Sequence, residues 1–360
     1  MIEIDGSIGE GGGQVLRTSL ALSAVLRREV RIFNIRAGRA EPGLKAQHLT
    51  GARALAQICG ASSKGLKIGS TELIFNPGRV KAGSFHFDVG TAGSITLVLQ
   101  TLMPLLPFAL GKVEVAITGG TDVKWSPPID YLRLVTIPFL ERMGVHASIS
   151  VSLRGHYPKG GGMVRFTSTP TAVLTNITGG EDGKVTAIRG VSHSVKLPVH
   201  VAERQASAAT RIVEEKNFPP PKIEIDVSEN GPNMGPGSGI VLCAITSNGG
   251  LLGGDSLGER GRPAEVVGED AARKLLEEIG SGAFLDRHMG DMIVPYVALA
   301  EGVSDLSLSQ VTLHTLTNVK VAERVAGVCF DPLPGVGMPA KLRVRGLGLK
   351  RANVSASAKE

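Results

Sequence analysis

The residues best suited to chemistry lie late in the chain, in the segment Val311-Thr312-Leu313-His314-Thr315-Leu316-Thr317-Asn318. The segment alternates β-branched and apolar residues and then supplies an imidazole, hydroxyls and an amide before a helix-like run over residues 319–325. This order predicts that His314 lies at the carboxyl end of a strand, beside the start of a helix. A neutral imidazole there could attack a phosphorus atom while the positive helix end holds the phosphate oxygens. The alternative is a histidine that only caps or packs.

A glycine loop near the amino terminus is the second candidate, and it precedes a predicted helix. Its glycines are Gly6, Gly9, Gly11, Gly12 and Gly13. Such a loop lets the backbone approach a phosphate closely, although a tight structural turn is an equal alternative. The loop has neither the Gly-Lys-Ser/Thr of a P-loop nor the spacing of the dinucleotide fingerprint. Glu10 would repel a phosphate unless a divalent cation lay between them, so it indicates a metal ligand.

Cationic groups cluster in the same part of the chain: Arg17, Arg36, Arg39 and His48. The pair in Arg36-Ala37-Gly38-Arg39 can hold a phosphate bidentately, and a solvated basic face is the alternative.

Asp291 could be an ordinary charge at the start of a helix. The basic loop over residues 157–162 supports a turn as readily as a site.

Composition narrows the classes of protein. The 360 residues are 42% hydrophobic, and Lys plus Arg (39) exceeds Asp plus Glu (33) by 6, which suits a polyanionic partner such as nucleic acid or a nucleotide. Aromatic residues make up only 4%, so we expect contacts to RNA through phosphates and sugars rather than base stacking. Cys59, Cys243 and Cys329 have no ligand spacing and predict neither a disulfide framework nor a zinc site. Without a signal peptide or a membrane span, we expect a soluble, cytoplasmic protein.

Strands and helices that alternate along the chain must position these residues. Residues 2–60 and 86–145 each predict a β-loop-α-β-loop-α unit, with helices over 15–26, 44–59 and 95–106. A third unit is predicted over 281–330, where Gly290-Asp291 opens a helix and a strand surrounds Val311. The repeats should bring their loops to one face of an α/β fold.

A stretch between the second and third units breaks this rhythm. It predicts strands over 185–188, 223–227 and 240–246, and helices over 199–217 and 263–279. We therefore expect a large catalytic domain over residues 1–182 and 281–345, with a smaller inserted α/β domain over 183–280. A flexible tail is expected over 346–360.

The chain closely resembles the RNA 3'-terminal phosphate cyclase family, in its archaeal type, over nearly its whole length and in order. The matching motifs are Gly9-Glu10-Gly11-Gly12-Gly13-Gln14, Arg36-Ala37-Gly38-Arg39 with Pro42-Gly43, Gln47-His48-Leu49-Thr50, Gly93-Ser94, Gly119-Gly120-Thr121-Asp122, Pro158 with Gly160-Gly161-Gly162, and His314 with Thr317-Asn318. The resemblance implies a large domain of three repeats like the carboxyl-terminal domain of bacterial translation initiation factor three, plus a smaller inserted α/β domain.

The resemblance also implies the chemistry. His314 stands at the position of a nucleophile that attacks the α-phosphate of ATP, releases pyrophosphate and carries AMP. The AMP then passes to an RNA 3'-phosphate, and the 2'-hydroxyl closes a 2',3'-cyclic phosphate with release of AMP. Glu10 stands at a metal-ligand position for Mg²⁺ or Mn²⁺. No obligatory protein partner is implied, and a homodimer is left open.

Two groups of nucleotide- and phosphate-binding positions follow from the resemblance. Those around the triphosphate and RNA phosphate are Gln14, Arg17, Arg36, Arg39, Gln47 and His48. Those around the adenosine are Gln100, Pro127, Tyr131, His288 and Asp291, although relatives often carry tyrosine at the His288 position. A non-catalytic RNA-binding assembly factor on the same scaffold and an enolpyruvyl-type transferase are the alternatives, and the former branch lacks the histidine.

Overall fold

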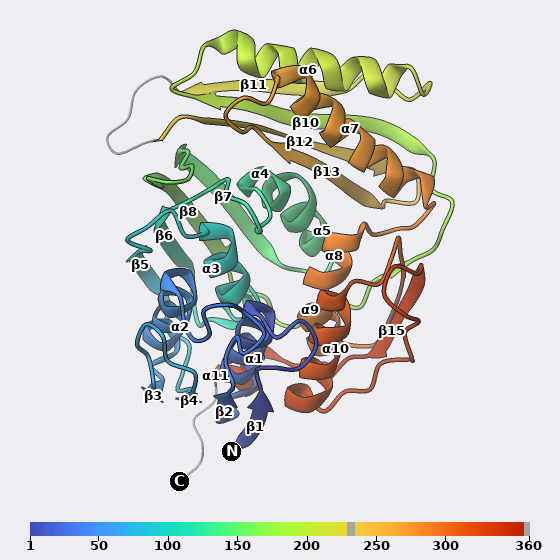
Figure 1. Ribbon diagram of the computed structural model, residues 1–360. Helices are drawn as coiled ribbons and strands as arrows, with labels where there is room; N and C mark the ends of the chain where they lie inside the picture. Colours follow the sequence, from blue (N-terminus) through green and yellow to red (C-terminus); the bar gives the residue numbers. More distant parts are fainter. Residues whose placement is uncertain (229–234, 356–360) are drawn as a thin grey trace.

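The computed structural model describes residues 1–228 and 235–355. Within them the protein is a mixed α/β structure whose strands form four sheets (Figure 1). Each sheet contains both parallel and antiparallel neighbours. No helix among the described residues is long and apolar enough to cross a membrane.

The amino-terminal sheet has the strand order β1-β2-β4-β3. Its first two strands are parallel and joined through helix α1, since parallel neighbours need a crossover connection. The elements are β1 (Ile2–Asp5), α1 (Gly13–Leu26), β2 (Val30–Phe33), α2 (Ala46–Cys59), β3 (Ser62–Lys64) and β4 (Leu73–Asn76). The helices predicted over 15–26 and 44–59 are thus confirmed as α1 and α2.

The second sheet repeats this arrangement, with the strand order β5-β6-β8-β7 and a parallel first pair. Its elements are β5 (Gly83–Asp88), α3 (Ile95–Leu102), η1 (Leu106–Phe108), β6 (Val113–Gly119), α4 (Ile129–Tyr131), η2 (Leu132–Thr136), α5 (Ile137–Glu141), β7 (His146–Leu153) and β8 (Gly162–Thr169). The helix predicted over 95–106 ends at Leu102, since prolines at 104 and 107 lack the amide hydrogen that a continuing helix needs.

The third sheet combines strands from distant parts of the chain, in the order β15-β14-β9. Its strands are β9 (Thr178–Gly179), β14 (Val303–Leu308) and β15 (Ala340–Arg345). The accompanying helices are α8 (Arg287–Met292), α9 (Val294–Leu299), α10 (Leu313–Ala326) and α11 (Arg351–Ser355).

The fourth sheet has the order β11-β10-β12-β13, and helices α6 and α7 cover one of its faces (Figure 1). Its elements are β10 (Val185–Val195), α6 (Val199–Glu214), β11 (Lys222–Ser228), β12 (Gly237–Thr246), β13 (Leu251–Leu257) and α7 (Ala264–Gly280). Side chains of β12 alternate between two cores, because successive strand residues face opposite sides of the sheet. Leu242 joins the small core under α6 and α7, whereas Val241 and Cys243 join the main core.

Helix α1 lies at the centre of the main core and packs against α2, α3 and α10. Every residue from Val15 to Val25 is buried, so this helix is apolar on nearly all sides. Its amino-terminal turn is therefore fixed rigidly beside that of α10.

Three expectations from the sequence are wrong. The helix expected to open at Gly290-Asp291 begins at Arg287 instead, with Asp286 as its cap. The strand expected around Val311 is β14, which ends at Leu308, and residues 313–326 are helical from the start. The tail expected over 346–360 instead continues into α11, and Val354 in that helix is 2% exposed. Apolar side chains such as Val354 and Leu349 pack on the main core, which the polar composition of the segment concealed. Residues 356–360 lie outside the described part of the chain.

Candidate functional site

His314 is the second residue of helix α10, and the turn before it is fixed by a cap. Thr312 accepts a hydrogen bond from the Thr315 amide at 3.0 Å, and the Thr315 hydroxyl accepts one from the Thr312 amide at 3.0 Å. This capping box starts the helix before His314, which is why the alternating pattern did not become a strand. The His314 side chain is 44% exposed and stands at the positive end of α10.

Glu10 faces His314 from the glycine loop. Its Oε2 lies 3.4 Å from His314 Nδ1 and 2.9 Å from the Arg39 guanidinium, and its side chain is only 9% exposed. Its Oε1 accepts a hydrogen bond from the Gln14 amide in the first turn of α1 at 3.2 Å. One carboxylate thus links the amino-terminal turns of α1 and α10.

The glycine loop reaches His314 because glycine removes a steric barrier. Gly9 has φ +62°, and a Cβ there would lie 2.0 Å from the Thr317 hydroxyl of α10. In the same contact, the Glu10 amide donates to Thr317 Oγ1 at 3.3 Å. The glycine loop therefore packs closely against the first turn of α10, at the point where α1 and α10 both begin.

Arg17 and His48 lie against the first residue of α1. A Cβ on Gly13 would be 2.4 Å from His48 Nε2 and 2.8 Å from Arg17 Nη1, and both side chains are 8% exposed. Burial lowers the pKa of His48 to about 3, assisted by the charges of Arg17, Arg36 and Lys45, so its imidazole is neutral. Burial also lowers the pKa of Arg17 to about 10, opposed by Glu10, and this guanidinium stays charged at neutral pH. These groups supply one fixed positive charge and one neutral imidazole beside the helix end.

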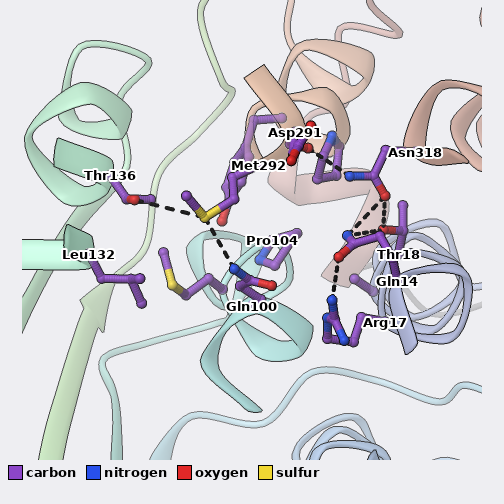
Figure 2. Close-up of a pocket in the computed structure, with 14 residues that line it drawn as sticks. Gln14, Arg17, Thr18, Gln100, Pro104, Leu132, Thr136, Asp291, Met292 and Asn318 are labelled. Carbon is purple, nitrogen blue, oxygen red and sulfur yellow. Dashed lines mark hydrogen bonds between the residues drawn. The ribbon is translucent and has the colours of Figure 1, made fainter. Parts of the chain in front are cut away.

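A chain of hydrogen bonds joins α1 to α10 and α8 beneath these groups (Figure 2). Asn318 Oδ1 accepts from Gln14 Nε2 at 2.9 Å and from Thr18 Oγ1 at 2.6 Å, and Asn318 Nδ2 donates to the Asp291 carbonyl at 2.7 Å. The Asp291 carboxylate accepts from the Thr312 and Thr315 hydroxyls, and burial raises its pKa. Asp291 therefore fixes the start of α10 through these hydrogen bonds and is more than a charge on its own helix.

A cavity opens between α1, α3, η2 and the α8–α9 segment (Figure 2). Its polar lining includes Gln14, Arg17, Gln100 and Asp291, and Gln100 Nε2 donates to the Met292 sulfur at 3.2 Å. Apolar groups such as Met292 complete it. The cavity has a volume of about 30 Å³ and a mostly apolar lining, beside a polar wall that continues toward Arg17.

Other predicted residues have different immediate partners. The Arg36 guanidinium donates to the carbonyls of Glu41 and Gly43, and Gln47 Oε1 accepts from the Ser94 amide at 2.9 Å. The carbonyl of Pro127 accepts from the Thr96 hydroxyl at 2.8 Å. In this structure the Arg36 and Gln47 side chains therefore bind backbone groups of nearby loops.

Tyr131 and His288 form an edge-to-face pair with ring centroids 6.1 Å apart. Tyr131 is 1% exposed and donates its hydroxyl to Asp286 at 2.6 Å, while His288 is exposed. Neither residue is part of the cavity lining, and neither is Pro127. Of the five residues that the resemblance places around the adenosine, Gln100 and Asp291 line this cavity and the other three do not.

Sequence reasoning missed Thr18, Met292 and Asp286. Thr18 had a usable signal, because Gln14, Arg17 and Thr18 form a polar stripe at helical spacing in an otherwise apolar helix. Asp286 had one too, since it caps the start of α8 and accepts from the His288 and Met289 amides. Met292 had none, because its partners Gln100 and Thr136 come from distant elements.

The mixed α/β fold joins an accessible imidazole, a carboxylate and a buried arginine at two adjacent helix starts. These features define a class: phosphate-handling proteins with a histidine beside the phosphate site.

Comparison with known proteins gives the family. The chain belongs to the RNA 3'-terminal phosphate cyclase family, whose model matches residues 8–331. A protein of Ignicoccus hospitalis described as RNA 3'-terminal phosphate cyclase is 52% identical over 356 residues, covering 98% of this chain and 100% of that protein. Similar proteins with the same description occur in Methanopyrus kandleri (48% identical, 96% and 99% covered) and Hyperthermus butylicus (50% identical, 97% and 99% covered).

Proposed function

We propose that this protein is an enzyme that converts the 3'-terminal phosphate of RNA to a 2',3'-cyclic phosphodiester, using ATP and a covalent adenylate on His314. Family membership over nearly the whole chain supports the reaction. The observation that carries the proposed route is the contact of His314 Nδ1 with Glu10 Oε2, 3.4 Å apart at the start of α10.

This contact favours one tautomer of the imidazole. His314 Nδ1 makes no hydrogen bond among the described residues and lies 3.4 Å from Glu10 Oε2, so a small turn of the ring lets a proton on Nδ1 reach the carboxylate and leaves the lone pair on Nε2. Nε2 then attacks the α-phosphorus of ATP, the new P–N bond forms, and the bond to pyrophosphate breaks. The positive amino-terminal end of helix α10 favours the oxygens of the reacting phosphate.

The second and third steps use the activated AMP. An oxygen of the RNA 3'-phosphate attacks the adenylate phosphorus, which breaks the P–N bond and restores His314. The 2'-hydroxyl then attacks the 3'-phosphorus, loses its proton and expels AMP. Adenylation is needed because the phosphate monoester has no good leaving group of its own.

Arg17, Arg39, His48 and Gln14 are the groups proposed for the triphosphate and RNA phosphate. Arg17 supports this role because it is buried, charged and lacks a hydrogen-bond partner for Nε among the described residues. Gln100 and Asp291 are proposed for the nucleoside because both line the cavity beside Arg17. The roles of Arg36, Gln47, Pro127, Tyr131 and His288 stay proposals from family resemblance.

The residues around Glu10 fit a Mg²⁺ or Mn²⁺ ion that is bound together with ATP. Mg²⁺ is usually held by one or two carboxylates, with substrate phosphates and water completing the shell. Glu10 supplies one nearly buried carboxylate, and Arg39, 50% exposed, can leave it for a phosphate. A bound cation would neutralise phosphate charge.

The finer architecture is also proposed from the resemblance. The parallel first pair in the β1-β2-β4-β3 and β5-β6-β8-β7 sheets supports repeated units in a large domain over 1–182 and 281–345. The separate core beneath α6 and α7 supports an inserted domain over 183–280.

The test is covalent labelling. Wild type and His314→Ala are incubated with ATP labelled at the α-phosphate and Mg²⁺ or Mn²⁺, then separated under denaturing conditions, with exposed His86→Ala as a matched control. We expect acid-labile label on wild type and His86→Ala and none on His314→Ala. Adding RNA with a 3'-phosphate should discharge the label and yield a cyclic end. Unlabelled wild type that still binds ATP would favour the non-catalytic RNA-binding protein.

A further inference from the structure

A second cluster of metal-ligating side chains lies away from His314, where the second and fourth sheets meet. Asp122 follows β6, His156 follows β7, and His193 belongs to β10. All three are buried, with exposed fractions of 2%, 6% and 0%. Two sheets thus supply one compact group of two imidazoles and one carboxylate.

The separation of the ring nitrogens matches that of two ligands on one ion. His156 Nε2 and His193 Nε2 are 3.2 Å apart, and His193 Nε2 is 3.8 Å from Asp122 Oδ2. Two nitrogens bound to tetrahedral Zn²⁺ at ~2.0–2.1 Å stand about 3.3 Å apart. In the structure the two imidazoles share a hydrogen bond, so both rings must turn to aim their lone pairs at one ion, and the carboxylate must approach by roughly half an ångström to reach the same spacing.

The glycines around the imidazoles keep both rings in place. A Cβ on Gly237 would lie 2.1 Å from the His156 ring, and one on Gly239 would lie 3.0 Å from His193 Cε1. The rings are therefore packed against the backbone of β12. Ligands held this way lose little freedom when they bind an ion.

Several atoms of the cluster still need a partner. Asp122 Oδ1 and His193 Nδ1 are buried and have no hydrogen-bond partner among the described residues. Asp122 Oδ2 accepts from the Thr121 hydroxyl at 2.6 Å, so the carboxylate is held while its other oxygen is left unused. A buried carboxylate oxygen without a partner is costly, and a cation held by both oxygens of Asp122 would satisfy Oδ1, whereas His193 Nδ1 stays unpaired when Nε2 binds the ion.

The ion pairs around the cluster leave the Asp122 carboxylate only weakly paired. Arg154, 1% exposed, contacts Asp130 at 2.6 Å and Asp226 at 2.8 Å, but reaches Asp122 only at 3.4 Å. Arg133 also pairs with Asp130, at 2.6 Å. Three carboxylates thus face two guanidiniums, and Asp122 is the least well paired of the three.

We propose that Asp122, His156 and His193 bind a divalent transition-metal ion, best matched by Zn²⁺, that ties the second and fourth sheets together. Two imidazoles and one carboxylate suit Zn²⁺ rather than Mg²⁺, which prefers oxygen ligands only. The site is structural, because its ligands are buried and come from both sheets. It is separate from Glu10 and does not depend on the proposed reaction.

The test counts Zn²⁺ bound to the full-length protein. All measurements use a Glu10→Gln background, which removes the carboxylate proposed for the catalytic ion. Chelator-stripped protein is titrated with Zn²⁺ by calorimetry and its metal content is measured by mass spectrometry. His193→Gln and His156→Gln are compared with exposed His200→Gln as the matched control. We expect one Zn²⁺ per chain in the background and the control, and at least tenfold weaker binding in the two cluster variants.

A spectroscopic measurement covers the case in which a cluster variant fails to fold. Co²⁺ replaces Zn²⁺ in the background protein, and proton NMR counts the shifted imidazole N–H signals of its ligands. Two such signals support the proposal. Zn²⁺ that does not bind, binds equally to folded His193→Gln, or gives a Co²⁺ complex without two imidazoles would overturn it, and the two rings would then simply share a hydrogen bond.

Discussion

His48 is kept uncharged by its surroundings, and this affects stability at acidic pH. Its pKa is about 3 in the folded protein, against an ordinary value of 6.5 for histidine. Between these values the unfolded chain binds more protons, so the free energy of unfolding should fall as pH drops from about 6.5 toward about 3. Above about 6.5 this group contributes no slope.

The first prediction concerns His48→Gln. Removing this histidine should reduce the slope of unfolding free energy against pH in that window by up to about 1.4 kcal/mol per pH unit. Urea unfolding at several pH values measures it, with His86→Gln as the exposed control. An unchanged slope would mean that His48 is protonated in the folded protein. His156 and His193 have lowered pKa values as well, so a residual slope should persist.

The start of α10 is the structural element on which the site depends most. The Thr312 hydroxyl accepts from the Thr315 amide and donates to Asp291 Oδ1 at 2.5 Å. One hydroxyl therefore caps the helix and ties it to α8. Since His314 lies in the first turn, any fraying there moves the imidazole away from Glu10.

The second prediction is that Thr312→Val destabilises the protein by about 1–2 kcal/mol, the usual cost of losing such a cap. Valine keeps the side-chain shape but leaves the Thr315 amide without its acceptor and Asp291 Oδ1 with only the Thr315 hydroxyl. Covalent labelling of His314 should fall along with stability. Thr312→Ser retains the hydroxyl and should restore both quantities. If valine is tolerated in urea unfolding and labelling alike, the cap does not position His314.

At the scale of the whole molecule, Arg154 joins two sheets through a buried charge network. It contacts Asp130 after β6 and Asp226 in β11, and it is almost fully buried. Breaking a buried pair by removing one partner leaves charges without compensation. The network therefore makes the junction between the sheets sensitive to a single substitution.

The third prediction is that Arg154→Met lowers the free energy of unfolding by about 3–5 kcal/mol. The matched control is Arg165→Met, since the Arg165 side chain is 66% exposed and lies 3.6 Å from Glu114. That change should cost less than about 1 kcal/mol. Urea unfolding compares both variants with the wild type, and similar losses for the two would show that burial gives Arg154 no special weight.

The sequence by itself identified the groups capable of chemistry and most of the helices. The glycine loop, the arginines beside it and His314 are local patterns, and the helices α1, α2, α6 and α7 follow from periodicity. Residue type and short-range spacing are enough for such features, because they depend on neighbouring residues in the chain. The start of α10 was predicted too late, since alternation up to Leu313 hid a capping box.

Only the tertiary structure decided which groups meet. Glu10 and His314 are separated by most of the chain, yet they face each other because α1 packs on α10. The cluster of Asp122, His156 and His193 likewise exists only where two sheets touch, and its residues carry no metal-binding spacing in the sequence. Burial and long-range packing set these contacts, and the charge state of His48 with them, because desolvation depends on every element that surrounds a group.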